Sequence, residues 1–246
     1  MARSFLVRGM LVGLVAGLLV FLYARYFGEP AVDGAIGVEE ELAKAAGEMP
    51  GPDLVPRDLQ SSWGLFTGVM LYSVAIGGIF SLLNAYAWGR VGRLGPRATA
   101  ALLAGAAFVA VYLVPFLKYP ANPPSVGNPD TIQYRTALYF GMIVVSVAAM
   151  VACLNLGRAL LGRLERWHAV LAAGATYIVI VLVAYAVLPS INEVPQAFPA
   201  VLLWQFRTVS LGMQAILWTA LALLFGELTE RSLRAVAMPA RPLRRA

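Results

Sequence analysis

Six long apolar segments are the feature of this sequence that most restricts its fold. At a rise of 1.5 Å per residue, about 20 helical residues cross the roughly 30 Å hydrocarbon core of a bilayer, and each segment is long enough to do so. The segments span residues 5–27, 62–88, 98–118, 136–158, 167–189 and 204–226. None alternates apolar and polar residues with a period of two, so they predict helices and not barrel strands. We therefore expect an all-α polytopic membrane protein with six transmembrane helices.

The composition excludes most soluble classes of protein. Of the 246 residues, 60% are apolar and 13% are charged, whereas a globular domain has roughly 45–50% apolar and about 25% charged residues. The chain has one cysteine, Cys153, and one histidine, His168, so neither an internal disulfide nor a cage of histidine and cysteine ligands for a metal is expected. No nucleophile–base pair, phosphate-binding loop or dinucleotide fingerprint is present, so we predict no enzyme, and the cofactor is left open.

Basic residues gather on one side of the predicted bundle. If both termini lie on the same side, that side receives 13 of the 19 lysines and arginines, while ten of the 13 acidic residues fall on the other. The positive-inside rule then places both termini, and the basic tail 236–246, in the cytoplasm. Contact between these loops and anionic lipid headgroups accounts for the net charge of +6, so we predict membrane lipid and no nucleic acid as a partner.

A short motif returns later in the chain. Gln133-Tyr134-Arg135-Thr136 recurs 72 residues on as Gln205-Phe206-Arg207-Thr208, and Gly141-Met142 recurs nearly in register as Gly212-Met213. The repeat predicts three helical hairpins, 1–90, 91–163 and 164–235, the first of which carries a long acidic outer loop at 28–61. Repeats of equal orientation are related by an axis along the membrane normal, here a pseudo-threefold axis. Its centre would be either a pathway or a closed core left by duplication.

The outer proline segments carry a resemblance to a known family. Two proline-rich stretches begin near the ends of the third and fifth apolar segments, Val114-Pro115-Phe116-Leu117-Lys118-Tyr119-Pro120-Ala121-Asn122-Pro123-Pro124 and Leu188-Pro189-Ser190-Ile191-Asn192-Glu193-Val194-Pro195. With these stretches, six spans and a long first outer loop, the chain resembles the predicted cobalt-transporter subunit family CbtA over roughly residues 5–230. This resemblance implies a prokaryotic inner-membrane protein linked to cobalt uptake. It also implies a small, histidine-bearing, single-span partner subunit, CbtB.

The sequence departs from that family at its histidines. The resemblance implies a histidine just before the proline of the third helix and another just after the proline ending the fifth, but this chain has Tyr112 or Val114 and Ser190 there. Imidazole is a favoured ligand of cobalt-like divalent ions. Tyr112 is therefore a candidate for the substrate path in which an expected metal ligand has been replaced.

Arg135 and Arg207 are the charges predicted to lie nearest to membrane depth, where an ionisable residue is a functional candidate. Each begins a helix, and a cation there opposes the positive end of the helix dipole. A lipid headgroup, a carbonyl of an outer proline loop or an anionic substrate would compensate. Structural anchoring and a substrate role both remain open, and two arginines on the path would repel a divalent cation.

Glu39, Glu40 and Glu41 give the first outer loop a negative field that would concentrate cations. The alternative interpretation is a solvated surface helix over 38–46, with Val38, Leu42 and Ala45 along one face, ended by Met49-Pro50-Gly51-Pro52.

Small and polar residues within the spans predict helix contacts. Gly13-x-x-x-Gly17 and Gly64-x-x-x-Gly68 would let backbones approach closely. Asn84 and Asn155 are candidates for the substrate path, and their alternative role is to form hydrogen bonds between helices. Cys153 is predicted to be a buried core residue and His168 an interfacial one.

Two functions remain open from the sequence. The first is a transport subunit that moves a small ion through a path formed by the hairpins. The second is a non-transporting accessory or scaffold subunit of a larger membrane complex.

Overall fold

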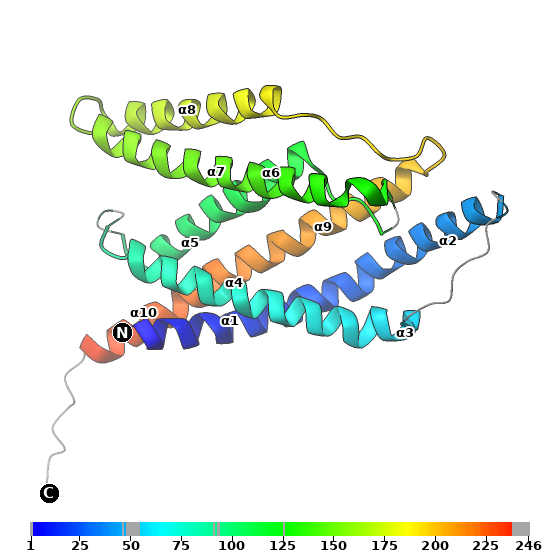
Figure 1. Ribbon diagram of the computed structural model, residues 1–246. Coiled ribbons are helices and arrows are strands. Elements are labelled where there is room, and N and C mark those ends of the chain that lie inside the picture. The colour runs from blue at the N-terminus through cyan, green and yellow to red at the C-terminus, as the bar shows by residue number, and fades with distance from the viewer. Residues whose placement is uncertain are drawn as a thin grey trace, which may run out of the picture. The chain divides into compact units, whose positions relative to one another are not determined.

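The computed structural model describes residues 2–45, 47, 55–90, 92, 94–124 and 126–237, and within these ranges its regular structure is entirely helical (Figure 1). The α-helices are α1 (Ala2–Tyr23), α2 (Glu29–Ala45), α3 (Arg57–Leu59), α4 (Leu65–Ala87), α5 (Pro96–Ala107), α6 (Val114–Lys118), α7 (Ile132–Leu160), α8 (Arg166–Val187), α9 (Ala200–Ala220) and α10 (Gly226–Ala237). Between them lie the π-helical segments η1 (Ala24–Gly28), η2 (Gln60–Gly64), η3 (Phe108–Leu113) and η5 (Leu221–Phe225), and the 3₁₀ turn η4 (Pro129–Thr131).

Six continuous helical stretches are long and apolar enough to cross a membrane. They run over residues 3–45, 57–87, 96–118, 129–160, 166–187 and 200–235. Each contains most of one apolar segment found in the sequence, so, for the described residues, the all-α fold is confirmed, as are six helices long and apolar enough to span a membrane. The basic tail 236–246 lies outside the described residues from 238 onward.

The first helix extends well beyond its apolar segment. Residues 29–45, expected to begin the acidic loop, form α2, which continues from α1 through η1. Pro30 lies just after this π-helical segment; a proline cannot donate to the carbonyl four residues earlier, and the wider local turn accommodates it. The predicted end of the surface helix at residues 49–52 lies outside the described residues.

The chain divides into two compact units, which are described separately. The first is drawn from Met1–Arg25, Val55–Gly105 and Ala215–Ala246, and the second from Tyr26–Leu54 and Ala106–Gln214. These boundaries differ from those of the three predicted hairpins, because α1, α5 and α9 each belong to helical stretches that pass from one unit to the other. The hairpin division and its pseudo-threefold axis stay predictions.

Glycine brings α1 and α4 into backbone contact in the first unit. A Cβ atom added at Gly13 would lie 2.4 Å from the Ser73 carbonyl oxygen, and one added at Gly77 would lie 2.3 Å from the Gly9 carbonyl oxygen. The prediction for Gly13-x-x-x-Gly17 is thus confirmed. The prediction for Gly64-x-x-x-Gly68 is wrong for the part of the chain that the structure describes, where a Cβ at Gly68 would have no atom within 4 Å and one at Gly64 would meet only the backbone of Leu59, five residues earlier.

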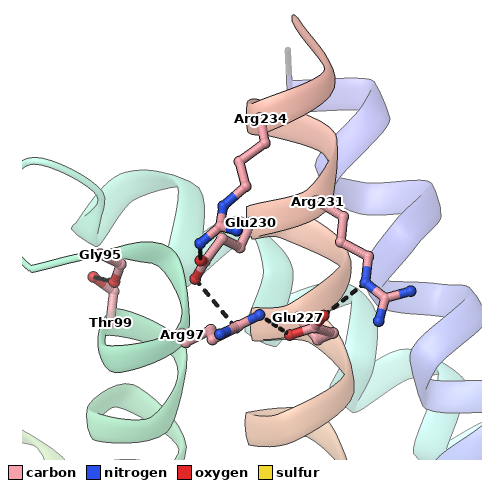
Figure 2. A network of polar contacts seen from close by, with 7 residues as sticks. All are labelled: Gly95, Arg97, Thr99, Glu227, Glu230, Arg231 and Arg234. Atoms are coloured by element: carbon pink, nitrogen blue, oxygen red, sulfur yellow. Dashed lines mark hydrogen bonds and ion pairs between the residues drawn. The ribbon is translucent and has the colours of Figure 1, made fainter. Parts of the chain in front are cut away.

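A charged network joins α5 and α10 in the same unit (Figure 2). Arg97 lies 2.6 Å from a carboxylate oxygen of Glu227 and 3.2 Å from one of Glu230. Each glutamate also pairs one turn along α10, with Arg231 and Arg234 respectively. Gly226 allows this approach, since a Cβ there would lie 3.0 Å from the Arg97 Cα. The network gives the carboxylates of Glu227 and Glu230 arginine partners at the point where α10 follows the apolar residues of η5.

In the second unit α7 and α8 form an antiparallel pair (Figure 1). Their core is built from Val114, Met142 and Val181. The hydroxyl groups of Ser146 and Tyr177 lie 2.8 Å apart and bond the two helices through their side chains. Cys153 on α7 is buried, as predicted.

The helix α2 packs within the second unit on loop residues and on α9. Ala35 is buried with Val126 and Phe198, and Val38 packs against that cluster. Leu42 and Ala45, predicted to lie with Val38 along one face of a surface helix, are both exposed. The packed part of α2 is therefore centred on Ala35 and Val38, which meet Val126, Phe198 and Leu202.

Candidate functional site

A cavity of about 580 Å³ lies within the second unit, and we call it the loop cavity. Its walls come from η3, α6, the start of α7, α9 and two proline loops, residues 119–128 and 188–199. Its polar and charged lining residues are Tyr112, Tyr119, Asn122, Arg135, Thr136, Tyr139, Asn192, Glu193, Arg207 and Ser210. The volume is typical of sites that bind small molecules, which combine apolar walls with a few convergent polar groups.

Arg135, in the first turn of α7, ties the two proline loops together. Its Nε lies 3.3 Å from a carboxylate oxygen of Glu193 in the second loop, and its Nη2 donates to the Asn128 carbonyl in the first. The side chains of Arg135 and Glu193 are 24% and 21% exposed. This pair neutralises the arginine and supplies the partner that its place at a helix N-terminus requires.

Glu193 is held by more than its ion pair. Its carboxylate accepts a hydrogen bond from the Thr131 hydroxyl at 2.7 Å and another from the Asn128 backbone N–H at 2.9 Å. These hydrogen bonds, with the charge of Arg135, lower the pKa of Glu193 below its ordinary value. The carboxylate is therefore ionised at neutral pH and joins the second proline loop to the start of α7.

Lower pH is expected to loosen this junction. The pKa of Glu193 is lower in the folded chain than in the unfolded chain, where it is about 4.3. The ionised carboxylate therefore stabilises the fold fully at a pH above about 4.3, and this stabilisation is lost as the pH falls through the pKa of the folded state. Glu193→Gln imitates the protonated state at pH 7. We expect faster hydrogen–deuterium exchange in peptides covering 126–135 of this variant. The exposed Glu165→Gln is the control, and protection equal to wild type in Glu193→Gln would contradict the expectation.

Arg207 lies two turns into α9, so the prediction that it begins its helix is wrong, and it binds the first proline loop. Its Nε donates to the Ala121 carbonyl at 3.2 Å and its Nη2 donates to the Asn122 side-chain oxygen at 2.9 Å. Both acceptors are neutral. The sequence left three partners open for the two arginines: a lipid headgroup, a proline-loop carbonyl and an anionic substrate. In the structure each arginine donates to a carbonyl of the first proline loop, and Arg135 also pairs with the carboxylate of Glu193.

Tyr112 faces the loop cavity from η3. It is 8% exposed, and its hydroxyl lies 2.9 Å from the Ser210 hydroxyl on α9. Its ring stacks on Phe116 and Phe108. The π-helical segment precedes Pro115, which lacks the N–H that would bond to the Val111 carbonyl, and such segments are frequent at functional sites.

Lysine and tyrosine hydrogen bonds fasten the wall of the cavity to α8. Lys118 donates to the Tyr185 carbonyl at 2.8 Å and to the Ser190 hydroxyl at 3.2 Å. Tyr119 donates to the Pro189 carbonyl at 2.9 Å, and Tyr185 donates to the Val114 carbonyl. The proline segments are therefore held in place by side chains from both of their flanks.

The structure brings three of the predicted path residues together and leaves the others elsewhere. Arg135, Arg207 and Tyr112 line the loop cavity. Asn155 is exposed on α7 and accepts from Arg158 on its own helix, and it does not line the loop cavity. Asn84 belongs to the first unit, is fully buried and has no hydrogen-bond partner for its amide among the described residues.

The predicted cation-attracting residues Glu39, Glu40 and Glu41 are exposed on α2 and do not line the loop cavity. Glu40 pairs with Lys44 one turn later, at 3.7 Å. Their arrangement fits the solvated surface of a helix.

Glu193, Asn122 and Ser210 are cavity residues that the sequence reasoning did not select. Glu193 could have been selected from the sequence, because it is an isolated acidic residue within a proline segment and has no basic residue near it in the sequence. Asn122 and Ser210 carried none, because their importance depends on which helix the loop meets.

The described residues contain no group of three or more histidine, cysteine, aspartate or glutamate side chains that could hold a metal ion. His168 is largely exposed and lies 3.6 Å from Glu165. Among the described residues that line the loop cavity, Glu193 brings the one carboxylate and there is no imidazole, whereas carboxylates and imidazoles are the usual protein ligands of divalent metal ions.

One family matches nearly the whole chain. Residues 2–230 match the family described as "Probable cobalt transporter subunit (CbtA)". No curated protein and no solved structure matches.

Proposed function

Because the chain belongs to the CbtA family of probable cobalt transporter subunits, we propose that it is the multi-pass subunit of a cobalt uptake system in the prokaryotic inner membrane. The observation that carries the proposal is the family match over residues 2–230, together with six helices long and apolar enough to span a membrane. We further propose that both termini are cytoplasmic, as the distribution of basic residues favours. The three hairpins would then surround an axis along the membrane normal.

We propose the loop cavity as the place where cargo meets this subunit. It is the polar cavity formed by the proline segments that carry the family resemblance, and it contains Arg135, Arg207 and Tyr112. Glu193 neutralises Arg135, but Arg207 keeps a positive charge that disfavours a bare divalent cation. Metal-binding groups would therefore come from elsewhere, and a single-span, histidine-bearing partner subunit is the proposed source.

Purification with bound partners and metal tests this proposal. The chain would be solubilised in mild detergent from cells of its source that were grown with cobalt, and bound metals and co-purifying chains would be identified by mass spectrometry. We expect a small single-span subunit in the complex, and cobalt bound to the complex but not to the chain purified alone. Recovery of a respiratory or photosynthetic complex without cobalt would refute the proposal and favour an accessory subunit.

A further inference from the structure

We infer that the loop cavity binds a small oxyanion, a carboxylate or a phosphate, against the guanidinium of Arg207. The inference rests on the charges and donors of the cavity and does not require that cobalt be the cargo.

The charges around the cavity leave one cation without a counter-charge. Three ionic side chains line it, namely Arg135, Glu193 and Arg207. Arg135 and Glu193 form an ion pair, and Glu193 also accepts hydrogen bonds from Thr131 and Asn128. Among the described residues no carboxylate lies within ion-pair distance of Arg207, whose partners are the carbonyl and amide oxygens of the first proline loop. The cavity therefore carries a net positive charge at Arg207.

The same hydrogen bonds fix the orientation of the guanidinium and leave donors free. A guanidinium has five N–H donors and no acceptor. Arg207 uses Nε and one Nη2 hydrogen toward the loop, which leaves three N–H groups without an acceptor among the described residues. Because the hydrogen bonds to the loop already fix the planar guanidinium, its remaining N–H groups can bind a carboxylate or phosphate with little further loss of side-chain entropy.

The surrounding groups suit an anion better than a cation. Thr136 brings a hydroxyl group to the wall, and the hydroxyls of Tyr112 and Ser210, which bond to each other at 2.9 Å, lie on the same lining, so donors and not carboxylates predominate beside Arg207. The cavity volume of about 580 Å³ accommodates a small organic acid or a phosphate with its water. A divalent cation in the same space would face the charge of Arg207, with Glu193 already engaged by three partners.

Equilibrium dialysis with radiolabelled citrate and radiolabelled inorganic phosphate tests the site on the purified full chain at constant ionic strength. We expect saturable binding of at least one of them, with a Kd about tenfold or more higher in Arg207→Gln, which keeps donors toward the loop but removes the charge. Arg207→Lys keeps the charge and should bind with intermediate affinity. Arg158→Gln, which removes an arginine outside the cavity, is the matched control and should bind as wild type does. Equal binding by Arg207→Gln would overturn the inference.

Protection of Arg207 from phenylglyoxal provides a test that needs no variant. The reagent modifies arginine side chains, and peptide mapping reports each site. In wild-type protein, citrate or phosphate is expected to slow modification of Arg207 several-fold and to leave Arg158 unchanged. Protection of both arginines to the same extent, or of neither by any probe used, would overturn the inference even if Arg207→Gln fails to fold.

Nanodiscs distinguish a soluble anion from a lipid headgroup. The same protection would be measured in discs of phosphatidylcholine alone and in discs that contain phosphatidylglycerol. Protection that requires phosphatidylglycerol assigns the site to a lipid phosphate, and protection by citrate in phosphatidylcholine discs assigns it to a soluble anion. Either result supports an oxyanion at Arg207. Neither depends on cobalt retention, so the proposed function and this inference can fail separately.

Discussion

Replacing Gly77 with valine is expected to separate α1 from α4 and to destabilise the first unit by about 3 kcal/mol or more. A Cβ at this position would lie 2.3 Å from the Gly9 carbonyl oxygen and 2.9 Å from the Gly13 Cα. Both atoms belong to backbone, so no side chain can rotate away and the helices themselves must move. Close approach of backbones is a main source of helix association in lipid, where apolar burial supplies little driving force.

Thermal unfolding in detergent, followed by circular dichroism, measures this effect. Gly68→Ala is the control, because no atom of the described residues lies within 4 Å of a Cβ there and alanine favours the helix by roughly 0.5–1 kcal/mol. We expect a large drop in the melting temperature of Gly77→Val and none in that of Gly68→Ala. Equal melting temperatures for Gly77→Val and wild type would show that α1 and α4 do not pack as described.

Replacing Asn84 with leucine is expected to stabilise the first unit by about 1–3 kcal/mol. The side chain is fully buried on α4, and neither its amide nitrogen nor its amide oxygen has a hydrogen-bond partner among the described residues. A buried polar group without a partner costs free energy that an apolar group of similar size does not. Leucine has the same number of side-chain heavy atoms as asparagine and branches at the same carbon, so the substitution removes that cost, and the larger methyl groups offset part of the gain.

The same unfolding assay checks this expectation against Asn155→Leu. Asn155 is exposed, and its substitution should change stability by no more than about 0.5 kcal/mol. A loss of stability in Asn84→Leu would contradict the interpretation and would reveal a partner for the amide, such as a buried water.

Hydropathy alone was sufficient to predict the helices, but not where each would end. The six apolar segments all lie in long helices because lipid leaves the backbone no other way to satisfy its hydrogen bonds. The limit of the first helix was missed, because hydropathy detects the apolar part of a helix and not its polar continuation. Residues 29–45 are helical although they are acidic and contain Pro30.

The two arginines of the site were predictable because a charge near membrane depth is rare, and a repeat of it is rarer. The partners of these arginines could not be predicted from the sequence. Arg207 binds residues 121 and 122, more than 80 positions away, and Arg135 binds Glu193, which lies in the second proline loop. Which loop meets which helix is decided by tertiary packing. For the same reason the sequence identified Gly13 and Gly17 as contact residues but also selected Gly64 and Gly68, at which an added Cβ would touch no other helix among the described residues.

Uptake of radioactive cobalt by intact cells is the most direct test of the proposed transport function. Cells lacking other cobalt importers would express this chain together with the proposed single-span partner, each of the two alone, or neither. We predict that initial uptake rises well above background only when both are present. Background uptake in cells that make both proteins in the membrane would contradict a role in cobalt transport.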